Sequence, residues 1–447
     1  MRYVRLLWNL LAMKRNEKKN REQMKKLQER KLREMLSFAY ENSPYYRKAF
    51  EEAGIDGRTV MTAPLSAFPK MNKALFMENF DELVTGKDLN QEELRKFDAE
   101  TSMEEKAFKE EYHVVHSSGS TGKPGYFIYD NFAWDSMITG MLRAALWGMS
   151  MGEILKFLIK GPRILYVAAT DGRYGGAMAV GDGIDGVGAK QLFLDVKTPL
   201  SEWIEKIREF QPNMVVGYPS AIKILGELEQ KGSISLQVKR IVSCGEPLGA
   251  SLRQYLEQTF HTVVLNYYGA SESLALGVEM TGEAGMSLFD DMNVIEVEED
   301  AIYLTCLYNF AQPLIRYRIS DRLMVLPEQD GDVNPFTMVK SIEGRSEDLL
   351  WFENSVGVRE FLHPLAVEGF CVDGLIDYQF RQTGKDAFEM LAEVSGKEKE
   401  ESVRQEMVKQ MRQILMEKHL EYVTFSVRFV NGIQPDVHTG KKKLIAA

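Results

Sequence analysis

Three short apolar segments, each followed by a polar turn, constrain the fold of this chain more than any other feature. They are Met214–Gly217, Arg240–Ser243 and Thr262–Leu265, and the first two lead through their turns into helix-like runs at Ala221–Gln230 and Ala250–Phe260. Strands that alternate with helices form a largely parallel sheet, whose ligands lie beyond the carboxyl ends of the strands. We therefore expect the three polar turns to gather at one edge of this sheet and to form a ligand site.

The segment Ser117–Pro124 is rich in hydroxyls and glycine and indicates phosphate chemistry. Strand-like runs flank it, which predicts a strand–loop–strand turn. Gly119 and Gly122 allow backbone N–H groups to approach an anion, and Lys123 adds a mobile positive charge. The glycine spacing is not that of a Walker loop. Taken alone, the segment also fits a polar surface hairpin.

Length and composition exclude several classes of protein. A chain of 447 residues holds about two or three domains. The net charge of −10 argues against a general nucleic-acid-binding protein, so we expect no nucleic-acid partner. Cys244, Cys306 and Cys371 are far apart and form no C-x-x-C pair, which disfavours a zinc ribbon, a redox dithiol and a secreted disulfide framework. We expect a cytoplasmic protein.

Residues 1–34 combine a short apolar helix with a basic run. Between Lys14 and Glu34 there are ten Lys or Arg and four Glu residues. The apolar stretch is too short to span a bilayer and no small-residue cleavage site follows it. Residues 1–34 either rest on an anionic membrane surface or pack on the body with a solvated outer face, and we favour the second interpretation. One helical face holds Tyr3, Leu6, Leu7, Leu10 and Leu11.

Further along the chain, Asn131–Met151 has the pattern of a single helix, and antiparallel strands are expected between Asn293 and Leu326. Beyond about Arg345 the pattern changes to a small α+β tail. A long helix at Glu398–His419 and a strand at Thr424–Val430 belong to this tail.

Six motifs in a fixed order resemble those of the adenylate-forming superfamily, the acyl-CoA synthetases and their relatives. Within it, the closest resemblance is to the phenylacetate–CoA ligase family with its capsule-locus and coenzyme-adenylylating branches. Ser117–Pro124 is similar to the family's Ser-Ser-Gly-Thr-Thr-Gly-Lys-Pro loop, with Ser120 at a Thr position. The other matching motifs are Ser243–Leu248, Tyr268–Glu272, Ile315–Asp321, Gly344–Asp348 and Gly440-Lys441.

The resemblance implies an α/β fold with a large N-terminal body of mixed sheets and helices and a small mobile α+β C-terminal lid. We expect a helical region packed on the body at 1–110, the nucleotide- and acyl-binding body at 111–345, and the lid at 346–447. The lid would rotate about Glu347, where the family has an aspartate. Ile319 and Ser320 also depart from the family's Thr and Gly.

The expected cofactors are ATP, Mg²⁺ and coenzyme A, and three residues are expected to carry the chemistry. Lys123 would hold the β- and γ-phosphates, and Glu272 would bind the metal. Lys441 would reach the carboxylate and the α-phosphate during adenylation, where its charge is useful in the transition state.

The remaining expected contacts are to the nucleotide. Tyr268 would stack on adenine, Gly245 would let the backbone approach the base, Asp321 would accept both ribose hydroxyls and Arg345 would bridge the hinge to the nucleotide. The full set is Ser117, Ser118, Gly119, Ser120, Thr121, Gly122, Gly245, Glu246, Pro247, Tyr267, Tyr268, Gly269, Ser271, Asp321 and Arg345.

The predicted reaction is ATP-dependent activation of a carboxylic acid, aryl or arylacetic by resemblance, to an acyl adenylate, followed by transfer to coenzyme A. One alternative keeps the adenylation but passes the acyl group to a carrier-protein thiol, or to a sugar amine or hydroxyl in polysaccharide or natural-product assembly. Another is a nucleotide-binding scaffold without turnover. A homodimer is the default for a soluble enzyme of this kind.

Overall fold

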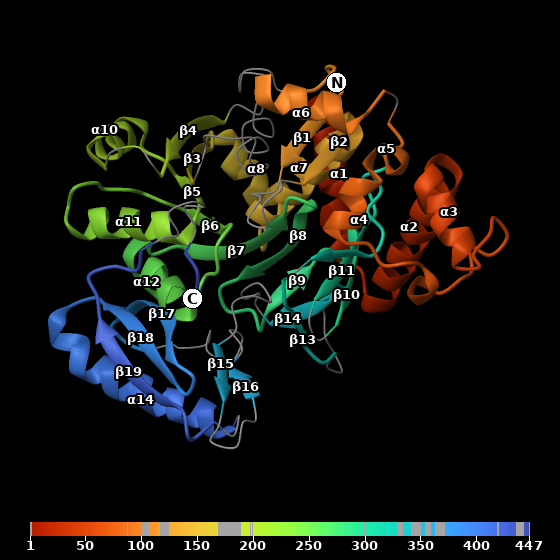
Figure 1. Ribbon diagram of the computed structural model, residues 1–447. Coiled ribbons are helices and arrows are strands. Elements are labelled where there is room, and N and C mark those ends of the chain that lie inside the picture. The colour runs from red at the N-terminus through yellow and green to blue at the C-terminus, as the bar shows by residue number, and fades with distance from the viewer. Residues whose placement is uncertain are drawn as a thin grey trace.

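The computed structural model consists of a large body with a smaller C-terminal part against one side (Figure 1). It describes residues 2–86, 88–100, 107–116, 125–168, 189–196, 198, 200–298, 301–319, 321–328, 334–340, 350–353, 359–362, 372–417, 420–434 and 442–446. No helix among these residues is both long enough and apolar enough to cross a bilayer.

A nine-stranded mixed sheet forms the centre of the body, in the order β13-β14-β9-β8-β7-β6-β5-β3-β4. Strands β3 to β7 run parallel, as predicted, whereas β8, β9, β14 and β13 extend the sheet in antiparallel fashion. The strands are β3 Arg163–Ala168, β4 Lys190–Asp195, β5 Met214–Gly217, β6 Arg240–Cys244, β7 Val263–Ala270, β8 Ser273–Met280, β9 Met286–Leu288, β13 Met324–Val325 and β14 Met338–Lys340.

Helices follow two of the three segments that suggested the sheet. Helices α11 (Pro219–Gln230) and α12 (Ala250–Phe260) pack on each other and on the sheet, close to the ranges predicted. Helix α10 (Leu200–Phe210) precedes β5. No helix follows the third segment, because β7 continues to Ala270 and the chain returns directly as β8. At Gly269 a Cβ atom would lie 2.5 Å from the carbonyl oxygen of Leu274, so this tight hairpin requires glycine.

The segment 117–124 lies between two strands, as predicted, although the segment itself is outside the described residues. Strands β1 (Tyr112–His116) and β2 (Tyr126–Asp130) pair in antiparallel fashion on either side of it.

The expected helix Asn131–Met151 is wrong in length. It divides into α7 (Asn131–Ala145) and α8 (Met151–Ile159). Gly148 adopts a φ of 75°, and Ser150 starts α8 with a capping box to Glu153. These local signals end one helix and begin the next.

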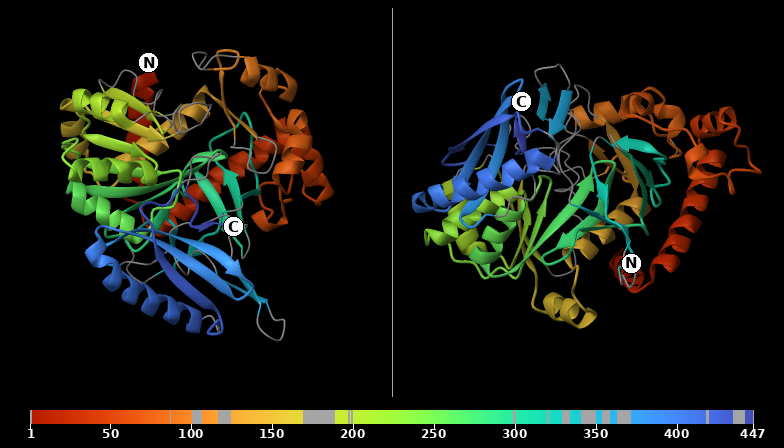
Figure 2. Two further views of the ribbon diagram at one scale, coloured as in Figure 1. Left: turned by 60° about the vertical axis from the view of Figure 1, so that its left-hand side comes forward. Right: turned by 90° about the horizontal axis from the view of Figure 1, so that it is seen from below.

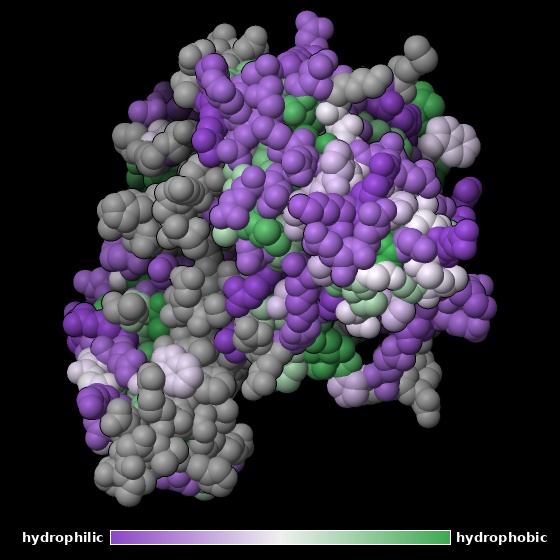
Figure 3. Space-filling view, turned by 45° about the vertical axis from the view of Figure 1, so that its right-hand side comes forward, coloured by the Kyte–Doolittle hydropathy of each residue, from purple (hydrophilic) through white to green (hydrophobic). Residues whose placement is uncertain are grey.

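The N-terminal region is helical and packs against the body. Its elements are α1 Arg2–Asn16, α2 Arg21–Asn42, α3 Pro44–Glu52, the 3₁₀ turn Leu65–Ala67, α4 Lys73–Glu78, α5 Phe80–Leu83 and α6 Gln91–Glu100. Helix α1 lies against α7, and both Arg2 and Arg5 form ion pairs with Asp135. In the face shown in Figure 3, hydrophilic side chains cover most of the described surface.

A buried ion pair links α7 to the body beside α1 and α2. Arg143 donates to Asp291 at 2.8 Å, and the exposed fractions of the two side chains are 0% and 1%. Asn16 also donates to Asp291, and Lys31 donates to its backbone carbonyl at 2.7 Å. Burial alone would raise the pKa of Asp291, but the Arg143 charge and these contacts outweigh it and lower that pKa.

A three-stranded antiparallel sheet completes the body, in agreement with the pattern after Asn293. Its strands are β10 (Asn293–Val297), β11 (Ile302–Cys306) and β12 (Tyr317–Ile319). Arg316, which precedes β12, is buried, pairs with Glu296 and donates to the Phe68 carbonyl, so it ties this sheet to the N-terminal region.

The C-terminal part has a hydrophobic core of its own, and Figure 2 shows it in blue beside the body. Its four-stranded sheet has the order β19-β18-β17-β20 and is covered by the long helix α14. The elements are β15 Leu350–Glu353, β16 Arg359–Leu362, β17 Leu375–Gly384, β18 Ala387–Val394, the 3₁₀ turn Lys397–Lys399, α14 Glu400–Glu417, β19 Thr424–Phe429 and β20 Ile445–Ala446.

Candidate functional site

The polar turns that follow β5, β6 and β7 meet at one edge of the sheet, as predicted. The register places Gly217 beside Ser243, and Cys244 beside Tyr267, so β5 and β6 end next to each other and next to the last four residues of β7. Because these strands are parallel, their carboxyl ends open onto a common surface.

The turn after β6 is built on a glycine. Gly245 has a φ of 79°, and a Cβ atom there would lie 2.7 Å from the ring of Tyr218. The backbone can therefore pack directly on this ring only without a side chain. This is the position at which a close approach to a base was predicted.

The carboxylate of Glu246 is bonded within the protein. It accepts hydrogen bonds from the backbone N–H and the hydroxyl of Ser220, at 3.1 and 3.0 Å, and from the backbone N–H of Lys442 at 2.9 Å. Burial raises the pKa of Glu246, although these donors act in the opposite direction. Glu246 was predicted to contact the nucleotide, but in this structure its side chain joins the body to the C-terminal segment.

Two of the predicted nucleotide-binding residues meet in space. The hydroxyl of Tyr268, at the end of β7, donates to Asp321 at 2.7 Å although the two are far apart in sequence. Burial raises the pKa of Tyr268 well above its ordinary value, and the nearby Asp321 charge adds to the effect. A neutral Tyr268 can therefore orient the Asp321 carboxylate, the group predicted to accept ribose hydroxyls.

Glu272, the predicted metal ligand, lies in the same neighbourhood on the β7–β8 turn. Burial raises the pKa of Tyr317, and the Glu272 charge contributes in the same direction. The preceding residue, Ser271, accepts a hydrogen bond through its carbonyl from Tyr129 at 2.9 Å. Glu272 is half-buried, so a ligand can reach its carboxylate.

Two buried hydroxyls at the strand ends have no hydrogen-bond partner among the described residues. They belong to Ser243 on β6 and Tyr267 on β7. Burial raises the pKa of Tyr267 well above its ordinary value, so its hydroxyl keeps its proton. Buried polar atoms are normally paired, so these two hydroxyls are available to a bound ligand.

The contacts between the body and the C-terminal part include residues that the sequence did not indicate. Lys223 on α11 forms a buried ion pair with Glu393 on β18, and their exposed fractions are 9% and 7%. The Ser251 hydroxyl accepts from the backbone N–H of Val372 at 3.5 Å. No local pattern could have identified these partners, because Lys223 and Glu393 lie 170 residues apart.

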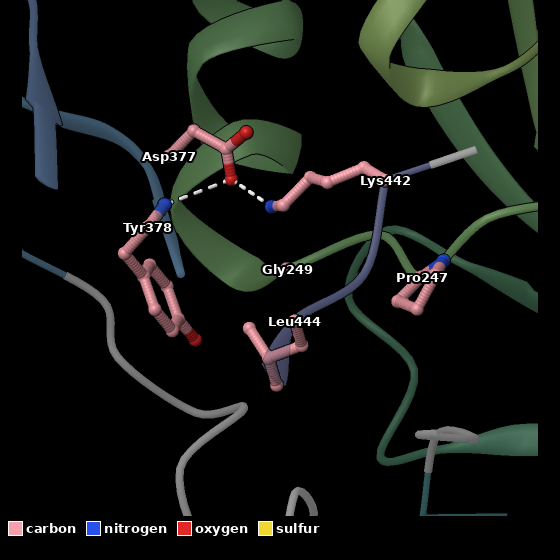
Figure 4. Close-up of a pocket in the computed structure, with 6 residues that line it drawn as sticks. All are labelled: Pro247, Gly249, Asp377, Tyr378, Lys442 and Leu444. Carbon is pink, nitrogen blue, oxygen red and sulfur yellow. Dashed lines mark hydrogen bonds and ion pairs between the residues drawn. The ribbon is translucent and has the colours of Figure 1, made fainter. Parts of the chain in front are cut away.

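A small pocket lies between the turn after β6 and the C-terminal segment, and Figure 4 shows the residues around it. Lys442 extends across it to Asp377 and pairs with that carboxylate. Its lining residues are Pro247, Gly249, Asp377, Tyr378, Lys442 and Leu444.

Several predicted site residues lie outside the described residues. They are the loop Ser117–Pro124 with Lys123, the hinge residues Arg345 and Glu347, and the terminal pair Gly440-Lys441. Their assigned roles stay predictions. In the described part of the chain, no cluster of three or more His, Cys, Asp or Glu residues could hold a metal ion.

Comparison with known proteins supports the family suggested by the motifs. No family model matches the chain. The Escherichia coli K-12 phenylacetate–coenzyme A ligase is 28% identical over 359 residues, which cover 74% of this chain and 72% of that enzyme. The Pseudomonas putida phenylacetate–coenzyme A ligase is 27% identical over 348 residues, covering 72% and 70%.

A solved structure shares the fold over nearly the whole chain. The 2-hydroxyisobutyryl-CoA ligase in its postadenylation state aligns with a TM-score of 0.70 at 19% identity, covering 97% of this chain and 91% of that one. The same ligase in its thioesterification state aligns over the same shares with a TM-score of 0.57. The body and C-terminal part are therefore arranged more as in the postadenylation state.

The sequence relatives, the shared fold and the order of the motifs lead to one assignment. This chain is similar in sequence to the phenylacetate–coenzyme A ligases, of which it is a distant relative, and it shares the fold of the 2-hydroxyisobutyryl-CoA ligase.

Proposed function

We propose that this enzyme activates an aryl or arylacetic acid with ATP and transfers the acyl group to coenzyme A. In the first half-reaction a carboxylate oxygen attacks the α-phosphorus, and pyrophosphate leaves to give the acyl adenylate. In the second, the thiolate of coenzyme A attacks the acyl carbonyl carbon, and AMP leaves as the thioester forms.

The observation that carries this proposal is the meeting of separate motifs at the sheet edge. Gly245, Tyr268 and Asp321 come from three different motifs, and the Tyr268 hydroxyl donates to Asp321 beside the turn that Gly245 opens. Glu246 holds the backbone of Lys442, the residue after the predicted catalytic Lys441. This contact supports a role for the terminal Gly-Lys motif at the same site.

The residues present fit a magnesium nucleotide. Mg²⁺ prefers oxygen ligands and is commonly held by one or two carboxylates together with substrate phosphates and water. Glu272 offers such a carboxylate near Tyr317, and a bound Mg²⁺ would neutralise the phosphate charge that a second anion must approach. Lys123 would supply a further positive charge there.

In the second half-reaction the C-terminal part, residues 346–447, would act as a lid that turns about Glu347. Its separate core supports movement as a unit. The pairing of Lys223 with Glu393 and the Glu246–Lys442 hydrogen bond support a docked position in which adenylation occurs. Both contacts would break as the lid turns to admit coenzyme A.

The names of the sequence relatives favour an arylacetic acid, and acid-dependent ATP–pyrophosphate exchange tests this choice. We would measure exchange with aryl, arylacetic, fatty and amino acids, comparing the wild type with Lys441→Ala. The matched control is Lys443→Ala, which removes an exposed lysine two residues away. We expect exchange with one acid class, at least about a hundredfold loss in Lys441→Ala, and little change in the control.

Adding coenzyme A to the pre-formed acyl adenylate then tests the acceptor, with AMP release as the readout. Rapid release and a thioester product support coenzyme A, whereas release only with a carrier protein or an aminosugar would replace it with that acceptor. ATP binding without exchange for any acid would contradict adenylation itself and favour a nucleotide-binding scaffold.

A further inference from the structure

The predicted apolar face of α1 is only partly buried, because Leu7, one of its members, is exposed on a neighbouring face. Leu6 and Leu10 are buried against the body. Val4, Leu7 and Trp8 recur at i, i+3 and i+4, so they share a second helical face, and they are 60%, 50% and 61% exposed. A surface helix normally turns its polar side to water, so this second face needs an explanation.

Helix α8 repeats this arrangement beside α1. Ile154 is buried in a small cluster with Leu10 of α1, which brings the two helices together. Met151, Leu155 and Ile159, spaced at i, i+4 and i+8, are 39%, 59% and 76% exposed. Figure 2 shows α8 projecting from the side of the molecule on which the N-terminus lies.

Exposed large apolar side chains are concentrated on α1 and α8. Across the described residues, fifteen large apolar side chains are exposed, and six of them lie on these two short helices. We call the six the α1–α8 face: Val4, Leu7, Trp8, Met151, Leu155 and Ile159.

Positive charge surrounds the α1–α8 face, although the protein is acidic overall. Arg15 and Lys18 are exposed at the end of α1, and Lys156 and Lys160 are exposed on and just after α8. Helix α1 contains no acidic residue, and Glu153 of α8 is bonded to the capping Ser150. An apolar face with a basic rim complements a surface that is apolar beneath an anionic layer.

The basic run of α2 does not form part of this rim, because its side chains have partners within the protein. Arg21 pairs with Asp290, Lys25 with Glu328 and Arg33 with Glu29. Within residues 1–34, α1 is therefore the part that could contact a membrane, and α8 would contact the membrane beside it.

We infer that the α1–α8 face docks on an anionic lipid surface, with its apolar side chains at the acyl boundary and its basic rim at the headgroups. A second copy of this chain is the less favourable occupant. A two-fold contact would bring the two basic rims together, and like charges would then repel.

Vesicle sedimentation with the full chain tests this inference. The probes are vesicles of pure phosphatidylcholine and vesicles in which about a third of the lipid is phosphatidylserine. We expect binding to the anionic vesicles, and at least about tenfold weaker binding to the neutral ones and at high salt. The double variant Trp8→Glu/Leu155→Glu should lose at least about tenfold in affinity for the anionic vesicles.

The matched control is Met416→Glu, which places the same charge on an exposed apolar position of α14 that is 51% exposed. It should bind vesicles like the wild type, and all variants should unfold at similar temperatures because the substituted side chains are exposed. Absence of wild-type binding, or equal binding to both vesicle types, would overturn the inference. So would a concentration-dependent dimer, measured by light scattering, that only the double variant abolishes.

Discussion

The ion pair between Lys223 and Glu393 should control how firmly the proposed lid docks on the body. Removing one partner of a buried pair costs about 3–5 kcal/mol because the other charge stays buried. Glu227 lies 3.7 Å from Lys223 and can take over part of this role, so we take the lower value. For Glu393→Gln, about 3 kcal/mol corresponds to roughly a hundredfold shift of the docking equilibrium toward the undocked lid.

Hydrogen–deuterium exchange reports this shift without assuming any activity. The backbone N–H of Lys442 donates to Glu246 of the body, so the Lys442 amide should lose protection in Glu393→Gln, whereas β20 keeps its pairing with β17. If adenylation needs the docked lid, acid-dependent pyrophosphate exchange should fall at least about tenfold, whereas thioester formation from pre-formed acyl adenylate should change much less.

Two controls separate the charge effect from general damage. The double variant Lys223→Met/Glu393→Leu replaces the pair with apolar groups and should restore protection of the Lys442 amide, because no charge is left buried alone. Asp373→Asn removes the exposed ion pair with Lys399 in the same lid and should cost less than about 1 kcal/mol. Unchanged protection in Glu393→Gln would refute the reasoning.

Three further predictions concern the body. Tyr268→Phe removes the hydrogen bond to Asp321 and should weaken ATP binding about tenfold in calorimetry with little loss of stability; unchanged affinity would contradict a role for this pair in binding. Gly245→Ala should lower the unfolding temperature more than Gly232→Ala, because both have positive φ but only the first meets a neighbouring ring. The pKa of Asp291 is lowered, so its contribution to stability is complete above about pH 4 and is lost as pH falls through that lower pKa. Asp291→Asn should therefore flatten the pH dependence of the free energy of unfolding, measured with urea, below about pH 4, and should lower that free energy at pH 7.

Local sequence patterns predicted the parallel half of the sheet because each of its strands is apolar and is followed by a distinct polar turn. The helix after Gly249 was placed correctly for that reason. The break between α7 and α8 was missed although Gly148 and Ser150 carry its signals, because the apolar periodicity on both sides was read as one continuous helix.

Site residues could be predicted where a local motif indicates their chemistry. Contacts between residues far apart in the sequence could not be predicted, because they form only in the folded structure. Tyr268 and Asp321 were both identified, but their direct hydrogen bond is a product of the tertiary structure. Glu246 was assigned to the nucleotide because its motif adjoins the site, whereas burial beside Ser220 directs its carboxylate into the protein. The ion pair of Lys223 with Glu393 could not be predicted from the sequence, because it too forms only when distant parts of the chain fold together.

The attachment of the first helices to residues near position 290 has a consequence for synthesis on the ribosome. Arg21 binds Asp290 and Lys31 donates to the Asp291 carbonyl, so each waits for a partner made about 260 residues later. At about 5–20 residues per second, this delay is roughly 15–50 s. During this delay α2 lacks the part of its covering surface that β10 and its neighbours provide. Nascent chains of this enzyme should therefore depend on chaperones until the second half of the body emerges.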